Sequence, residues 1–160
     1  MGLLGGSFNP AHGGHLHISL LAMKQLRLDE VWWVVSPQNP LKNAAEMAPF
    51  AKRLTSARVY AHHPDIVVTD VEQRLGTRYT ADTLEAFKVC FPRTHFVWLM
   101  GADNLAQISD WQRWTWIFNL VPIAIFDRAP YSFDALAGKA AHAFSRFKLR
   151  HKDAAGLVEH

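Results

Sequence analysis

The chain has 160 residues, of which 49% are hydrophobic and 19% are charged, so we predict a packed globular domain and exclude a disordered chain. Its formal net charge of +3 suits an anionic substrate but is too small to indicate nucleic-acid binding by itself. The single cysteine, Cys90, excludes an internal disulfide and a zinc site built from thiols. Its apolar context predicts a buried helix residue.

Targeting and membrane signals are missing from the sequence pattern. No apolar run is long enough to span a bilayer. Met1 leads directly into a short apolar strand and a glycine-rich turn, unlike a signal peptide. We therefore expect a cytoplasmic protein without a membrane partner.

Strands and helices alternate in the first half of the chain. Short β-rich runs predict strands over residues 2–4, 31–35 and 65–69. Apolar residues at helical spacing predict helices over residues 15–26 and 49–61, the second with its proline in the first turn. The run VWWVV at 31–35 has no polar position, which is typical of a strand covered on both faces.

The alternation continues in the second half. In chain order we predict a polar loop over 73–79, a helix over 80–91, a strand over 95–100, helical pieces over 105–108 and 111–120, a strand over 121–126 and a helix over 133–147. Thr80 is the expected N-cap of the helix that it begins. The pattern predicts an α/β fold: a Rossmann-like, doubly wound, parallel five-stranded sheet with helices on both faces.

Four loops follow the carboxyl ends of the predicted strands, where ligands bind in such sheets. They span residues 5–15, 36–42, 73–80 and 101–111, and all four carry polar or aromatic residues. We expect the ligand site to lie among them.

The first of these loops contains a glycine turn. Gly5 and Gly6 follow a strand and precede a helix, which is how α/β folds build a phosphate site. Without Cβ atoms, the backbone can approach a phosphate closely. Ser7 and Phe8 then offer backbone N–H groups. A Gly-Gly pair alone is a weak signal, because many turns that contain one bind nothing.

Two histidines, His12 and His15, follow the glycine turn. Their spacing lets both imidazoles face one anion near the positive end of the helix. A metal site is the alternative, but it needs a third ligand that the sequence does not supply nearby. We predict that both side chains donate hydrogen bonds to charge that develops on a transferring nucleotide.

Five segments in order carry a resemblance to a known family. They are GGSFNPAHGGH at 5–15, SPQNPLK at 36–42, RYTADTL at 78–84, GADN at 101–104, and Trp111. The histidine segment resembles the signature of the nucleotidyltransferase superfamily with the (H/T)xGH motif. The other segments make the chain resemble bacterial nicotinate-nucleotide adenylyltransferases over nearly its whole length.

The resemblance implies a role for each matching residue. His12 and His15 would be the catalytic residues and contact the ATP phosphates. The ATP site would comprise Gly5, Gly6, Ser7, Phe8, Gly101, Asp103 and Arg128. The residues around the pyridine mononucleotide would be Asn39, Lys42, Tyr79, Thr80, Asn104 and Trp111. Plainer roles stay open for some of them: a helix cap for Asp103, a solvated loop charge for Lys42, a core position for Trp111, and an ion pair with Asp127 or Asp134 for Arg128.

The implied reaction transfers the adenylyl group of ATP to nicotinate mononucleotide, giving nicotinate adenine dinucleotide and pyrophosphate in NAD biosynthesis. Mg²⁺ would bridge the ATP phosphates, held by substrate oxygens and water and by no protein ligand. Nicotinamide mononucleotide and phosphopantetheine stay open as acceptors, as does a non-catalytic nucleotide-binding module. The basic stretch at 146–152 motivates a nucleic-acid binder, but we expect a solvated face and no nucleic-acid partner.

The C-terminal part departs from the family pattern. Members usually carry a Ser-(Ser/Thr)-x-x-Ile-Arg segment there, which helps to bind the triphosphate, and the sequence has none. We therefore expect one domain over residues 1–160 that lacks its C-terminal portion. The pattern leaves a monomer and a dimer equally open.

Overall fold

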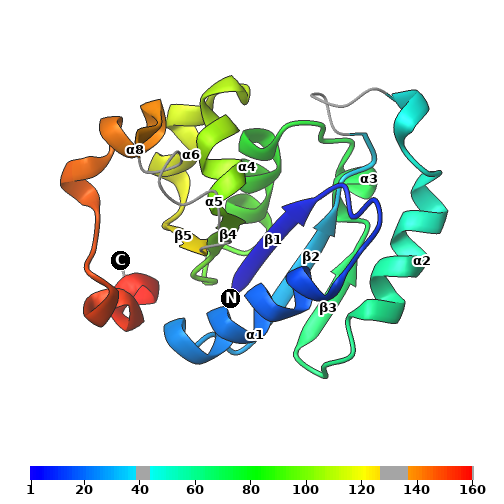
Figure 1. The fold of residues 1–160 in the computed structure, drawn as a ribbon, viewed down its shortest axis with the longest axis horizontal. Coiled ribbons are helices and arrows are strands. Elements are labelled where there is room, and N and C mark those ends of the chain that lie inside the picture. The colour runs from blue at the N-terminus through cyan, green and yellow to red at the C-terminus, as the bar shows by residue number, and fades with distance from the viewer. Residues whose placement is uncertain (39–43, 127–136, 160) are drawn as a thin grey trace.

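Five parallel strands form the centre of the protein in a computed structural model, which describes residues 1–38, 44–126 and 137–159. The strands are β1 (Gly2–Gly6), β2 (Val31–Val35), β3 (Ile66–Thr69), β4 (Val97–Gly101) and β5 (Ile123–Phe126). Their order in the sheet is β3-β2-β1-β4-β5 (Figure 1). The chain adds β2 and β3 on one side of β1, then returns to add β4 and β5 on its other side. This change of direction confirms the predicted doubly wound sheet.

Helices cover both faces of the sheet. One face packs against α1 (Gly13–Leu26) and α2 (Phe50–Tyr60). The other packs against α3 (Val71–Leu75), α4 (Thr80–Cys90), α5 (Ala102–Gln107), α6 (Trp114–Leu120) and α8 (Lys139–Ala143). Four short 3₁₀ segments complete the described elements: η1 (Ala44–Glu46), η2 (Ile108–Asp110), η3 (Ser145–Phe147) and η4 (His151–Glu159).

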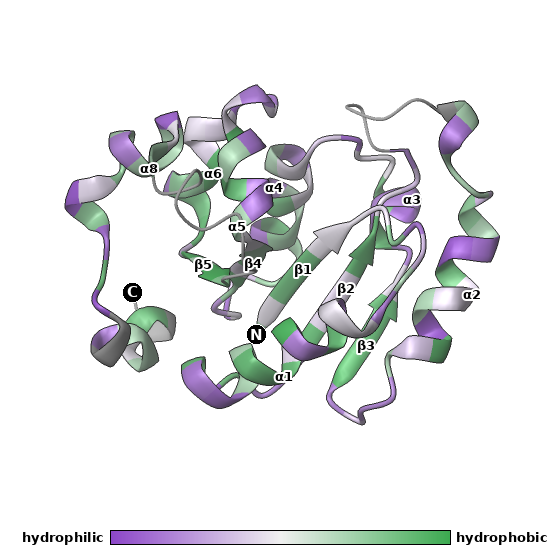
Figure 2. Cartoon of the chain, in the orientation of Figure 1, coloured by the Kyte–Doolittle hydropathy of each residue, from purple (hydrophilic) through white to green (hydrophobic). Residues whose placement is uncertain are grey.

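The core has two halves because successive strand residues point to opposite faces. In β1, Leu3 joins one hydrophobic cluster and Leu4 the other. In β4, Trp98 and Leu99 divide in the same way. The strands β2 and β3 are hydrophobic along most of their length (Figure 2), as expected for a sheet between two helical layers.

Two predicted elements differ between β3 and β4. The predicted loop at 73–79 begins inside a helix, α3, which ends where Gly76 takes a left-handed conformation with φ 67°. The helix α4 does begin at Thr80, but its N-cap is Tyr79, so the prediction of a Thr80 cap was wrong. Cys90 ends this helix and is exposed rather than buried.

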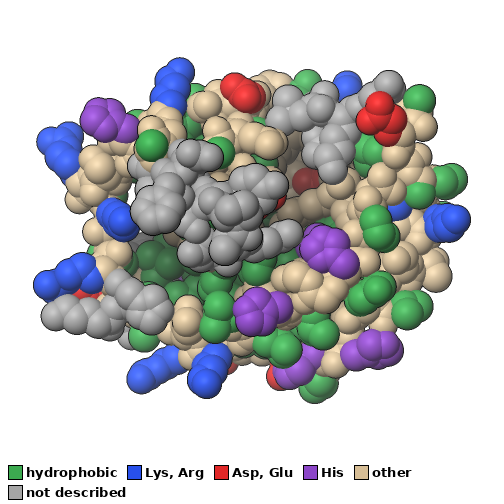
Figure 3. All heavy atoms as spheres, in the orientation of Figure 1, with side chains coloured by type: hydrophobic (Ala, Val, Ile, Leu, Met, Phe, Trp, Pro, Cys, Tyr) green, Lys and Arg blue, Asp and Glu red, His purple; other side chains and the backbone are tan. Residues whose placement is uncertain are grey.

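Residues 137–147 are less regular than the predicted helix over 133–147, of which residues 133–136 lie outside the described part. Ala137 is helical, Gly138 bends the chain before α8, and the 3₁₀ turn η3 follows α8. The later segment η4 lies against α1 (Figure 1), where Leu157 packs on the core. Lys and Arg side chains lie at the left of Figure 3. In the C-terminal part, Arg150 pairs with Asp153.

Gly5 has a packing role that the glycine-turn argument missed. A Cβ atom at Gly5 would lie 2.2 Å from the end of the buried Trp98 ring. A Cβ atom at Gly6 would make only ordinary contact, 3.5 Å from the ring of Phe8. The absence of a side chain at Gly5 is therefore required by the indole of β4, whether or not a phosphate approaches.

We predict that Gly5→Ala lowers the free energy of unfolding by about 1–3 kcal/mol, because the Trp98 ring must move out of a packed core. Gly6→Ala is the matched control and should change it by less than about 0.5 kcal/mol. Urea denaturation of both variants measures this. Equal stabilities for the two variants would contradict the packing argument.

Candidate active site

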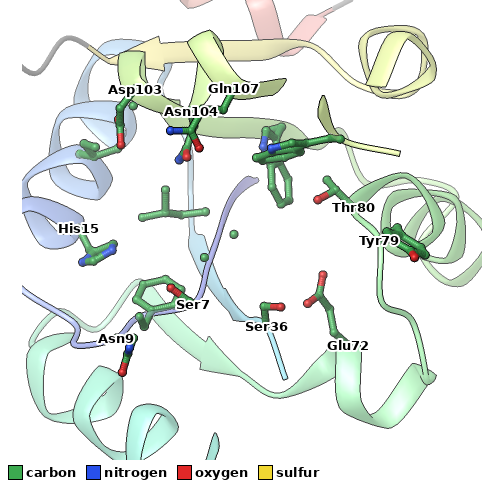
Figure 4. Close-up of a pocket in the computed structure, with 18 of the residues that line it drawn as sticks. Ser7, Asn9, His15, Ser36, Glu72, Tyr79, Thr80, Asp103, Asn104 and Gln107 are labelled. Carbon is green, nitrogen blue, oxygen red and sulfur yellow. The ribbon is translucent and has the colours of Figure 1, made fainter. Parts of the chain in front are cut away.

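A cavity of about 560 Å³ opens beyond the carboxyl ends of the strands, at the crevice between β1 and β4. Its size falls within the range of small-molecule sites, about 300–1,000 Å³. The described residues of the predicted site all line it (Figure 4): Gly5, Gly6, Ser7, Phe8, His12, His15, Tyr79, Thr80, Gly101, Asp103, Asn104 and Trp111. Asn39, Lys42 and Arg128 lie outside the described residues.

His12 and His15 begin helix α1 as a reciprocal capping box. The Gly14 N–H donates to His12 Nδ1 at 3.1 Å, and the His12 N–H donates to His15 Nδ1 at 3.2 Å. A neutral imidazole that accepts at Nδ1 carries its proton on Nε2. The helix cap therefore makes each side chain an Nε2–H donor, with the two ring centroids 4.0 Å apart.

Buried neighbours fix the position of His15. The Phe8 ring packs on it with centroids 4.6 Å apart and stacks on Trp33 at 5.2 Å. Trp33 also donates from Nε1 to Ser19 Oγ, and Ser19 donates to the His15 carbonyl. Phe8 reaches this place with a φ of 46°, an uncommon conformation for a bulky residue. Its ring therefore supports the imidazole from inside the core.

Arg53 holds two of the site loops together. The side chain of this α2 residue is 2% exposed, and its guanidinium donates to carbonyls at the ends of two strands. The bonds reach Ser7 at 2.6 Å after β1, and Ser36 at 2.8 Å and Pro37 at 2.7 Å after β2. Sequence analysis missed this residue, although an arginine one turn from Phe50 and Ala57, on the helix face that packs in the core, was a usable signal.

Asn9 braces the glycine loop from the same side. Its amide donates to the carbonyl of Glu46 at 3.2 Å and accepts from the N–H of Ala48 at 3.1 Å. The loop is thus fixed to the segment before α2 as well as to the guanidinium of Arg53.

The acceptor side of the predicted site lies at the start of α4. Tyr79 and Thr80 line the cavity there, and Trp111, on the turn before α6, lines the same cavity. Arg113 fixes that turn: its backbone is left-handed, with φ 54°, and its guanidinium donates to Glu85 at 2.6 Å. The hydrogen bond from Arg113 lowers the pKa of Glu85, whose side chain is solvent-exposed.

Asp103 follows the N-cap Gly101 and is the second residue of α5, so it is not the cap of that helix. Its Oδ1 atom is buried, and no described residue donates a hydrogen bond to it. Since buried acceptors are nearly always bonded, this oxygen is a candidate contact for a ligand hydroxyl.

Glu72 is a cavity residue that sequence analysis did not predict. It lies on α3, 5% exposed, with its carboxyl between Ser36 and Thr80 in Figure 4. Burial raises the pKa of Glu72 to about 7, and hydrogen bonds from Thr83 and Ser36 oppose the rise. A usable signal was its place three residues after the end of β3, near the strand end where residues that contact ligands gather in such folds.

Among the described residues, no group of three His, Cys, Asp or Glu side chains is placed to hold a metal ion. The cavity instead presents oxygens from Ser7, Asn104 and Asp103. This donor set suits a hydrated Mg²⁺ whose main ligands are substrate phosphates. Within the same residues, no helix is long and apolar enough to cross a membrane.

We predict that Glu72 makes stability depend on pH. Between its ordinary pKa of 4.5 and about 7, the folded chain holds a proton that the unfolded chain has lost. The free energy of unfolding should therefore fall as pH rises through this window, by up to about 3 kcal/mol. Glu72→Gln should lack this fall. Urea denaturation at several pH values measures it, and the same profile in both proteins would contradict the shift.

Comparisons with known proteins identify the family. The Cytidylyltransferase-like family model matches residues 3–152. A protein of Parvibaculum lavamentivorans named "Probable nicotinate-nucleotide adenylyltransferase" is 54% identical, over 98% of this chain and 78% of its own. One of the same name from Cereibacter sphaeroides is 50% identical, over 97% of this chain and 83% of its own.

A solved structure shares the fold at low identity. The nicotinic acid mononucleotide adenylyltransferase of Plasmodium falciparum, complexed with NaAD, has a TM-score of 0.65 and 17% identity. The alignment covers 90% of this chain and 82% of that one. The sequence relatives and the family model show that the chain belongs to the nicotinate-nucleotide adenylyltransferases, a family of nucleotidyltransferases.

Proposed function

We propose that this protein transfers the adenylyl group of ATP to nicotinate mononucleotide and releases pyrophosphate and nicotinate adenine dinucleotide, a step of NAD biosynthesis. The observation that carries the proposal is the pair of imidazoles, 4.0 Å apart, at the start of α1 in the crevice of the sheet. Relatives about 50% identical bear the name of this activity.

ATP would bind with its phosphates at the glycine turn and the first turn of α1. The positive end of this helix attracts anions, and the backbone of the turn offers N–H groups. Gly101 and Asp103 would hold the adenosine part, with the buried Asp103 oxygen accepting from a hydroxyl. We extend the ATP site to Arg128, on the sequence resemblance alone.

Nicotinate mononucleotide would bind across the crevice, beside the start of α4. The flat indole of Trp111 suits a pyridine ring, and the N–H groups at Tyr79 and Thr80 suit an anionic substituent. Asn104 lines the same cavity. We add Asn39 and Lys42 to the acceptor site on the sequence resemblance alone.

Chemistry would proceed by in-line displacement. A phosphate oxygen of the acceptor attacks the α-phosphorus of ATP, a new P–O bond forms, and the bond to the β-phosphate oxygen breaks. The electron pair and negative charge leave with pyrophosphate. The acceptor phosphate is already ionised, so no protein nucleophile or base is needed.

The protein's contribution is then positioning and charge stabilisation. His12 and His15 would donate from Nε2 to phosphate oxygens whose charge grows as the bond breaks. Because their Nδ1 atoms are held by backbone N–H groups, the donors are oriented before ATP binds. Mg²⁺ would be held by ATP oxygens and water near Ser7 and Asp103, and it would neutralise phosphate charge.

Three features of the proposal rest on the sequence alone. The cytoplasmic location, the absence of a nucleic-acid partner and the choice between monomer and dimer stay predictions. The identity of the acceptor is tested by the reaction itself, since nicotinamide mononucleotide and phosphopantetheine are the competing substrates.

We predict that His15→Ala lowers kcat by about 100-fold or more, as expected for loss of an oriented donor. His17→Ala, an exposed histidine of the same helix, should leave kcat unchanged. A coupled assay of pyrophosphate release with ATP and each of the three acceptors measures this. Faster turnover with another acceptor would change the assigned substrate, and ATP binding without pyrophosphate release would support a non-catalytic module.

A further inference from the structure

Glu72 lines the cavity and is hydrogen-bonded to the loop that supplies Tyr79 and Thr80 to it. We call residues 77–80 the acceptor segment, because they join α3 to α4 and supply Tyr79 and Thr80 to the cavity. The Glu72 backbone carbonyl accepts from the Thr77 N–H at 3.1 Å, so the segment begins on Glu72 itself. The carboxyl of Glu72 reaches the other end of the segment through Thr83.

Thr83 is fully buried and shares one hydroxyl among three neighbours. Its Oγ1 atom lies 3.0 Å from Glu72 Oε1, 2.9 Å from Thr77 Oγ1 and 3.2 Å from the Tyr79 carbonyl oxygen. A hydroxyl has one proton to donate and can accept two. The Tyr79 carbonyl can only accept. It therefore receives a hydrogen bond from the Thr83 hydroxyl only when the carboxyl of Glu72 does not accept that proton.

The protonation state of Glu72 decides this competition. A protonated carboxyl donates to Thr83 Oγ1, which leaves the Thr83 proton for the Tyr79 carbonyl. An ionised carboxyl has no proton and accepts the Thr83 proton in a stronger, charge-assisted bond. Ionisation therefore takes a hydrogen bond from the backbone of the acceptor segment and adds a negative charge to the cavity.

No described residue forms an ion pair with Glu72. The titratable or charged residues on α3 and its N-cap, on the acceptor segment and on α4 are Asp70, Arg74, Arg78, Tyr79, Asp82, Glu85, Lys88 and Cys90, and Arg53 of α2 donates to the Ser36 carbonyl. His12, His15, Asp103 and Asp110 line the same cavity. Among the nearer cations, Arg74 pairs with Asp70, and Arg53 donates to backbone carbonyls. Burial without a compensating cation is the cause that raises the pKa of Glu72 to about 7.

We propose that Glu72 is a positioning residue for the acceptor: while its carboxyl is protonated, the acceptor segment keeps its binding conformation, and loss of that proton weakens acceptor binding but not ATP binding. The inference rests on the proposed function, in which the acceptor is an anionic mononucleotide bound at Tyr79 and Thr80. Both effects of ionisation, the lost hydrogen bond and the added charge, act on the acceptor side of the cavity.

The test measures KM for nicotinate mononucleotide, KM for ATP, and kcat between about pH 6 and about pH 8.5. In the unaltered protein, the acceptor KM should rise by up to about tenfold per pH unit above 7, while the ATP KM does not follow. Glu72→Gln, which keeps an N–H donor and cannot ionise, should hold the low acceptor KM across the range. Titration of the acceptor phosphate is common to both proteins and cancels in the comparison.

Asp70→Asn is the matched control. It removes a carboxylate at the start of the same helix that pairs with Arg74 and does not line the cavity, so its acceptor KM should follow the unaltered protein. The proposal is overturned if Glu72→Gln shows the unaltered pH profile, if it raises the acceptor KM at pH 6, or if the KM of ATP shifts with that of the acceptor.

Failure of the proposed function would be seen separately. If no acceptor yields pyrophosphate, adenylyl transfer is refuted, and calorimetric binding of nicotinate mononucleotide replaces KM. Binding that weakens above pH 7 in the unaltered protein and not in Glu72→Gln supports the role of Glu72. The same pH dependence in both, or no binding at all, overturns it.

Discussion

The start of α1 depends on two hydrogen bonds accepted by imidazole nitrogens. Serine or threonine and glutamate usually make such a capping box, and here His12 and His15 take both places. The bonds satisfy backbone N–H groups that a helix start would otherwise leave unpaired. They also fix the tautomer of both rings. The same Nδ1 atoms therefore cap the helix and leave Nε2–H as the donor of each ring. Loss of either ring would affect both the cap and the donors.

The loops of the site are held in place by a buried cation. Arg53 has no carboxylate partner among the described residues, and its guanidinium is satisfied by backbone carbonyls of the β1 and β2 loops and of Ala48. Because these carbonyls are neutral, they do not cancel the positive charge of the Arg53 guanidinium, which lies behind the glycine turn. Because charge interacts strongly where water is excluded, this placement favours anions in the cavity in front of it.

The sequence predicted the parts of the protein that follow from local pattern. Period and composition placed all five strands near their observed positions, and the rule for parallel sheets placed the ligand loops at one edge. Pattern could not show that Gly5 makes room for Trp98, because that contact joins residues 93 positions apart in the chain. The place of Glu72 after a strand could mark it as a residue near the ligand, but pattern could not show its role, since its carboxyl matters through burial and through Thr83, which are properties of the folded chain.

Ser36 joins the two buried ionisable side chains of the site, Arg53 and Glu72. Its carbonyl accepts from Arg53, and its hydroxyl bonds to the carboxyl of Glu72. Arginine stays charged even when buried, whereas a buried carboxyl can avoid the cost of charge by keeping its proton. Up to about pH 7, the wall around Ser36 therefore carries a positive charge and a largely neutral acid. This asymmetry favours an anionic acceptor bound at Tyr79 and Thr80, since an ionised carboxyl at Glu72 would repel it.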